Sequence, residues 1–121
     1  MRRPSLALAL AINRAVREAD EWFDEPDDVD RVRKALARIA NVDDPVVAAG
    51  ALAYRLTRAQ AFGEGNKRTA FLLARWLLDR NGADGLALLP PDDREFADIL
   101  VRAAAGREVE AELVALLNSR R

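Results

Sequence analysis

A short run of glycines and polar residues at positions 60–69, QAFGEGNKRT, contains side chains suited to binding a phosphate. Lys67 and Arg68 supply two adjacent positive charges, and Asn66 offers both a hydrogen-bond donor and an acceptor. Glu64 adds a carboxylate, which is the type of ligand that Mg²⁺ uses beside phosphate oxygens. The residue types therefore indicate a site for a phosphate together with magnesium.

The placement of the two cations also indicates a bound anion. A helix is predicted to start at Asn66, so Lys67 and Arg68 fall in its first turn. Positive side chains there oppose the helix dipole and lie beside unpaired N–H groups, an arrangement that a bound anion reverses into a favourable one. Gly63 and Gly65 allow the backbone to approach a ligand closely or to adopt a positive φ angle.

A plainer explanation needs no ligand. In that interpretation Glu64 is a surface charge, Asn66 caps the helix, and Lys67 and Arg68 form a solvated face. A Walker phosphate loop is excluded, because its four-residue glycine spacing and its Gly-Lys pair are missing and a helix instead of a strand precedes the loop.

Composition narrows the chemistry. The chain has 121 residues, enough for one domain over residues 1–121, and no stretch is long enough to span a bilayer. Its 19 basic and 20 acidic residues give no positive excess for direct nucleic-acid binding. The absence of cysteine fits a reducing cytoplasm, and the absence of histidine removes the commonest general base.

Apolar residues at three- and four-residue steps predict an all-α, compact, single-domain bundle of about six helices. Ser5, Asp28 and Asp44 are the predicted caps of the first three helices, and Leu86 to Leu89 is predicted to be extended. The helices are predicted over residues 5–22, from Asp28 onward, and over 45–59, 66–80, 91–105 and 107–118. The residues predicted to face inward are Val29, Val32, Leu36 and Ile39 in the second helix, Val47, Ala51, Tyr54 and Leu56 in the third, and Ala70, Leu73, Trp76 and Leu77 in the fourth. The phosphate-binding residues thus lie on a loop, Gln60 to Gly65, and at the start of the helix that follows it.

The stretch QAFGEGNKRTA resembles the signature of the Fic/Doc family: His, any residue, Phe, any residue, Asp or Glu, Gly or Ala, Asn, Gly or Lys, Arg. All positions from Phe62 to Arg68 fit in register. The upstream VRKALARI and the downstream TAFLLARWLLDRNG extend the likeness to roughly residues 8–105, closest to Doc-type toxins. The resemblance implies a Fic-like active-site loop before the central helix.

The resemblance also implies roles for individual residues. Glu64 would help to hold Mg²⁺, and Asn66 with the loop amides at Gly63 and Gly65 would contact phosphate. Lys67 and Arg68 would grip the phosphates of ATP or another nucleotide. Phe62 would anchor the loop in the core.

The lysine at position 67 bears on the reaction. Family members with glycine there typically transfer a nucleoside monophosphate, whereas Doc-type members with lysine resemble kinases that transfer the terminal phosphate. Lys67 therefore favours phosphate transfer, and AMP transfer is the alternative. The resemblance further implies a protein target such as elongation factor Tu, and a small antitoxin that inserts a helical segment over the active site.

Gln60 departs from the family pattern, because it stands where the family has its histidine base. A carboxamide does not take up a proton near neutral pH, and losing a general base typically costs on the order of 10² to 10⁴ in rate. Three explanations fit: an inactivating substitution, a natural loss that leaves a pseudoenzyme, or a variant in which the substrate or Glu64 accepts the proton. A non-catalytic module that binds an antitoxin or a translation factor is the second class of function, and a helical structural protein without a ligand is the third.

Overall fold

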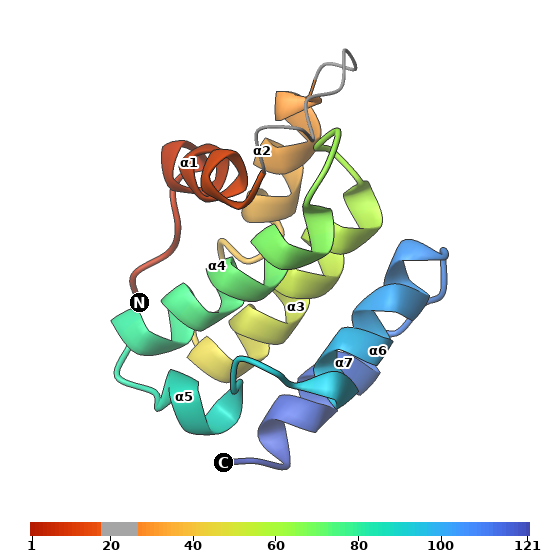
Figure 1. Cartoon of the computed structure of the whole chain (residues 1–121). Coiled ribbons are helices and arrows are strands. Elements are labelled where there is room, and N and C mark those ends of the chain that lie inside the picture. The colour runs from red at the N-terminus through yellow and green to blue at the C-terminus, as the bar shows by residue number, and fades with distance from the viewer. Residues whose placement is uncertain (18–26) are drawn as a thin grey trace.

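Helix α3 (Pro45–Ala59) is the central element of the computed structural model, which describes residues 1–17 and 27–121. It packs against four other helices, and Figure 1 shows it in yellow-green beside the green α4 (Asn66–Arg80). Small side chains let the neighbours approach closely. A Cβ atom added to Gly50 would lie 2.8 Å from Cγ2 of Val114 and 3.0 Å from its Cα. The contact between α3 and α7 (Glu110–Asn118) therefore requires glycine at this position.

All regular secondary structure in the described part of the chain is helical, which confirms the predicted all-α class. Figure 1 shows α1 and α2 on one side of the α3–α4 pair and α6 with α7 on the other. The remaining helices are α1 (Leu6–Val16), α2 (Val29–Ala37), α5 (Gly85–Leu88) and α6 (Arg94–Ala104).

Side-chain caps explain where most of the helices begin. Ser5, Asp28 and Asp44 each accept a hydrogen bond from a backbone N–H of the first turn, so all three predicted caps are confirmed. Helix α4 differs, because its N-cap is Gly65 in the left-handed conformation (φ 79°) and it has no side-chain cap. The backbone N–H groups of its first turn therefore need other hydrogen-bond partners.

Two helices have the predicted bounds, and several smaller predictions are wrong. The segment Leu86 to Leu89 was predicted to be extended, but a helical turn forms there because the Asp84 side chain accepts from Ala87 N–H and caps it. This turn raises the count to seven helices among the described residues. The last two helices start later than predicted, since Asp93 is the N-cap of α6 and Val109 that of α7.

Burial departs from the predictions at a few positions. Val29 was predicted to face inward but is 36% exposed, because it is the first residue of α2. Leu36, Val47, Ala51 and Trp76 are only half-buried. Helix α1 ends at Val16, earlier than predicted, because Arg17 is extended (ψ 131°). Residues 18–22 of the predicted first helix fall outside the described residues.

The C-terminal arginines reach the caps of two helices. Arg121 donates to both carboxylate oxygens of Asp44 (2.8 and 2.9 Å), and Arg120 pairs with the buried Asp93 and donates to the Leu88 carbonyl (3.0 Å). Burial opposes ionisation of Asp93, but the hydrogen bonds from Arg120 and from Phe96 N–H outweigh it and lower the pKa of this carboxyl. These contacts hold the starts of α3 and α6 together with the end of α7.

In the portion of the chain that the structure describes, no helix has the length and apolar character needed to cross a membrane.

Candidate functional site

The loop between α3 and α4 is closed by the side chain of Asn66. Its Oδ1 accepts from Phe62 N–H (3.1 Å) and its Nδ2 donates to Phe62 O (2.9 Å). Phe62 itself is buried in the core, as the resemblance implied. Asn66 therefore shapes the loop, and each of its polar groups keeps capacity for one further hydrogen bond.

A second polar side chain supports the loop from α1. Asn13 is buried (2% exposed), and its Nδ2 lies 2.9 Å from Glu64 O and 3.0 Å from Thr69 Oγ1. It joins α1 both to the loop and to the first turn of α4. The sequence analysis missed Asn13, although a polar residue on the same helical stripe as Ala9 and Val16 is a signal that could have identified it.

Glycine is required at position 65 because of this neighbour. Gly65 has a φ of 79°, and a Cβ atom there would lie 3.1 Å from Val16 Cγ2 and 3.4 Å from Asn13 Nδ2. The glycine thus serves a left-handed turn packed against α1. Its predicted role toward a ligand is carried only by its backbone N–H, which lies 3.3 Å from Glu64 Oε1.

The first turn of α4 brings cations and backbone N–H groups together. The first helical hydrogen bond runs from Thr69 N–H to Gly65 O (2.9 Å), so the N–H groups of residues 66–68 precede it. Lys67 is exposed and has no ion-pair partner among the described residues. Arg68 donates to the Val16 carbonyl through Nη1 (3.1 Å), which directs it toward the end of α1. Lys67 is accordingly the freer of the two predicted phosphate contacts.

Both predicted phosphate-binding amides of the loop already have a partner, that of Gly65 being the Glu64 carboxylate. Gly63 N–H donates to Asp27 Oδ1 (2.9 Å), and the same carboxylate pairs with Arg17. The adjacent Asp28 N–H donates to Ala61 O (2.7 Å). A phosphate bound at the Gly63 amide would therefore have to replace the Asp27 carboxylate, a residue that the sequence analysis did not assign to the site.

Gln60, the residue at the position of the family's histidine, is the C-cap of α3. It is exposed, its φ and ψ are 46° and 45°, and its Nε2 donates to Ala104 O of α6 (2.9 Å). The sequence predicted a loop position for Gln60 but gave no signal for this partner, which is 44 residues away.

A groove of about 980 Å³ runs between α4 and α6 and includes both predicted phosphate-binding cations. This volume is within the range of small-molecule sites. Leu72 and Val101 are 41% and 55% exposed on its walls, so the groove combines apolar surface with charge. Four basic side chains line it, against two acidic ones, Asp92 and Asp93. Its lining from α4 is Lys67, Arg68, Phe71, Leu72 and Arg75, and its lining from α6 includes Arg94, Ala97, Leu100 and Val101.

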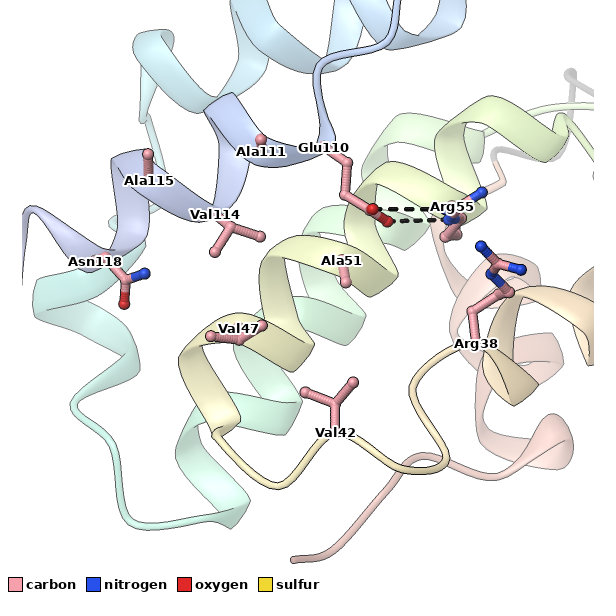
Figure 2. Close-up of a pocket in the computed structure, with 10 residues that line it drawn as sticks. All are labelled: Arg38, Val42, Val47, Ala51, Arg55, Glu110, Ala111, Val114, Ala115 and Asn118. Atoms are coloured by element: carbon pink, nitrogen blue, oxygen red, sulfur yellow. Dashed lines mark hydrogen bonds and ion pairs between the residues drawn. The ribbon is translucent and has the colours of Figure 1, made fainter.

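A second hollow of about 530 Å³ lies between α3 and α7 (Figure 2). Val47 and Ala51 of α3 face Val114 of α7 across it, and the ion pair of Arg55 with Glu110 (2.9 Å) spans one side. None of the site residues predicted from the sequence lines this hollow.

The carboxylates near the loop are too few to hold magnesium by themselves, so a bound ligand would have to supply further oxygen atoms. No group of three or more His, Cys, Asp or Glu side chains that could hold a metal occurs within the described ranges. Glu64 is the single predicted metal ligand of the loop. Since Mg²⁺ is commonly held by one or two carboxylates together with substrate phosphates, the donor set fits this ion when a nucleotide is bound.

A sequence model described as the Fic/DOC family matches residues 5–78, well over half of the chain. The chain belongs to the Fic/Doc family. The matched region of this Fic/Doc protein contains the loop, Asn13 and most of α4, whereas α6, which forms the other wall of the groove, lies beyond it. Searches of curated proteins and of solved structures gave no significant match.

Proposed function

We propose that this Fic/Doc protein binds ATP or another nucleotide through its phosphates at the start of α4, and is by descent a Doc-like protein phosphotransferase. The observation that carries the proposal is Lys67. It lies exposed in the first turn of α4, beside Arg68 and on the wall of the α4–α6 groove. Family members that transfer AMP typically have glycine at this position, so the lysine favours transfer of the terminal phosphate.

The proposed reaction moves the terminal phosphoryl group to a Ser or Thr hydroxyl of a protein. The hydroxyl loses its proton and a nucleoside diphosphate leaves. Phosphoryl transfer depends mainly on positioning and on neutralising charge, and Lys67, Arg68 and the N–H groups of residues 66–68 supply both. When bound beside Glu64, magnesium would add a further positive charge against the phosphates.

The chain has no evident side chain to accept the proton of the attacking hydroxyl. Gln60 cannot accept it, and the chain contains no histidine that could replace Gln60. We therefore expect transfer to be slower by about 10² to 10⁴ than with a base at position 60, while nucleotide binding is retained.

The proposed biological role is that of a cytoplasmic toxin whose target is a translation factor such as elongation factor Tu and whose inhibitor is a small antitoxin. The groove supports an antitoxin of definite chemistry. Exposed Leu72 and Val101 beside Lys67 and Arg94 suit a segment that carries both apolar and acidic side chains.

The test compares the chain with its Gln60→His variant, each incubated with magnesium ATP and elongation factor Tu, and measures the mass of the target. A phosphate-sized gain produced by Gln60→His and abolished by adding Lys67→Ala is the expected result. ATP labelled at the α or the γ phosphate distinguishes AMP transfer, the alternative reaction, from phosphate transfer. If Lys67→Ala leaves ATP affinity unchanged, the proposed phosphate contact is wrong.

A non-catalytic binding module is the second candidate, and the contact of Gln60 with Ala104 favours it. The hydrogen bond gives Gln60 a structural role that needs no catalysis. A protein that only binds its target also needs no general base at this position. Unmodified target with both the native chain and Gln60→His, together with a stable complex with that target, would support this candidate over the enzyme.

A further inference from the structure

Gln60 has an unusual backbone for its residue type. It is the only non-glycine residue with a positive φ in the described part of the chain. A residue with a Cβ atom pays an energetic penalty in this left-handed region, and such strain persists where the surrounding structure requires it. The side chain indicates what requires it here, because Nε2 donates to Ala104 O at 2.9 Å.

The acceptor is a carbonyl that the helix cannot satisfy by itself. Ala104 is the last residue of α6, and the chain then turns at Gly106 (φ 93°). The carbonyls just before Ala104 are taken by backbone donors: Ala105 N–H binds Val101 O, Gly106 N–H binds Ala103 O and Arg107 N–H binds Arg102 O, at 3.0 to 3.1 Å. Within the described residues, the Gln60 carboxamide is the donor that completes the C-terminus of α6.

This contact joins the two walls of the groove at their connection to the loop. Gln60 is the first residue of the loop that leads into α4, and Ala104 lies one turn beyond Leu100 and Val101 on the other wall. Arg58 adds a neighbouring link by donating to Arg107 O (3.3 Å).

We infer that Gln60 is a positioning residue that ties the start of the loop to the C-terminal end of α6 and thereby sets the opening of the α4–α6 groove. The inference rests on the proposed function insofar as the groove is taken as the nucleotide site. It assigns the residue a task that needs a hydrogen-bond donor and no proton transfer.

The chemistry of position 60 follows from this task. Glutamine and histidine both place a nitrogen, Nε2, four bonds from Cα, so an imidazole can donate to Ala104 O in the same way. That hydrogen bond would fix the tautomer and leave Nδ1 as the unprotonated, basic nitrogen. The tie and a base at this position are therefore compatible.

Three variants distinguish the effect of the hydrogen-bond donor at position 60 from the effects of side-chain shape and charge. Gln60→Met keeps the length of the side chain but has no donor. Gln60→Glu keeps its shape, has no donor near neutral pH, and adds a negative charge at a helix C-terminus, where it is unfavourable. Gln60→His restores a donor. Because Gln60 is exposed, all three chains are expected to fold.

The experiment measures hydrogen exchange at the amides of residues 105–107 and the affinity for magnesium ATP by calorimetry. Exchange should be faster by about two- to tenfold in Gln60→Met, faster still in Gln60→Glu, and near native in Gln60→His. ATP should bind more weakly, by a similar factor, in Gln60→Met and Gln60→Glu than in the native chain and Gln60→His.

Identical exchange in all four chains would overturn the tie. Altered exchange with equal ATP affinity would overturn its link to the groove. If no form binds ATP while exchange follows the expected order, the proposed nucleotide site fails and the tie between loop and α6 stands, so the two failures are distinguishable.

Discussion

Replacing the buried Asn13 by alanine should destabilise the protein through the loop that Asn13 supports. Asn13 is 2% exposed and provides one amide group to two acceptors, Glu64 O at 2.9 Å and Thr69 Oγ1 at 3.0 Å. Asn13→Ala removes the donor and leaves both acceptors behind. The loss of stability then depends on whether each acceptor can find another hydrogen-bond donor.

The two acceptors differ in this respect. Glu64 is only half-buried, so water can reach its carbonyl, and the net loss is about 1 kcal/mol. Thr69 is fully buried, and its orphaned hydroxyl oxygen costs about 1 to 2 kcal/mol. The total of about 2 to 3 kcal/mol corresponds to a fall in Tm of roughly 8 to 12 °C for a domain of this size.

Thermal and urea unfolding of Asn13→Ala, Thr69→Val and the double variant would test this estimate. The two sites are in contact, so the cycle should show a coupling free energy of about 0.5 to 1.5 kcal/mol. Additive effects, or a Tm within about 2 °C of the native value for Asn13→Ala, would refute the argument that this side chain holds the loop.

Two further predictions concern packing and charge. Gly50→Ala should cost about 1 to 3 kcal/mol, measured by urea unfolding, because the new methyl group would meet backbone atoms of Val114; an unchanged midpoint would show that α7 yields freely. Arg120→Met should destabilise the fold by about 1 to 2 kcal/mol at pH 7, because Asp93 loses its ionic partner. Because the pKa of Asp93 is lowered in the folded protein, the stabilisation from its ionised carboxylate is present above the usual pKa near 4 and is lost as the pH falls through the folded pKa. The difference in free energy of unfolding between Arg120→Met and the native chain should therefore narrow below about pH 4. It should be unchanged between about pH 5 and 7.

Local signals were sufficient to predict much of the fold and the position of the loop between α3 and α4. Asp44 before Pro45 marks the start of α3, and an apolar helical repeat follows the glycines of the loop, so the bounds of α3 and α4 were predicted correctly. These signals act within one or two helical turns. The short α5 was missed because a four-residue helix has almost no periodicity, and only its cap, Asp84, indicates it.

The partners of the site residues could not be predicted in the same way. Asn13 meets Glu64 across 51 residues of sequence, Asp27 meets Gly63 across 36, and Gln60 meets Ala104 across 44. Such contacts depend on how the helices pack, which a residue pattern does not specify. The sequence therefore located the loop and its charges, whereas the structure identified what holds them in place.

The support of the loop also bears on how such a protein can change during evolution. Asn13 and Arg68 grip main-chain carbonyls, those of Glu64 and Val16, which every residue type provides. The side chain of Lys67 has no ion-pair partner in the described residues and points into no packed core. Under the proposed function, a single substitution at position 67 would thus alter which phosphate the site favours with little effect on folding.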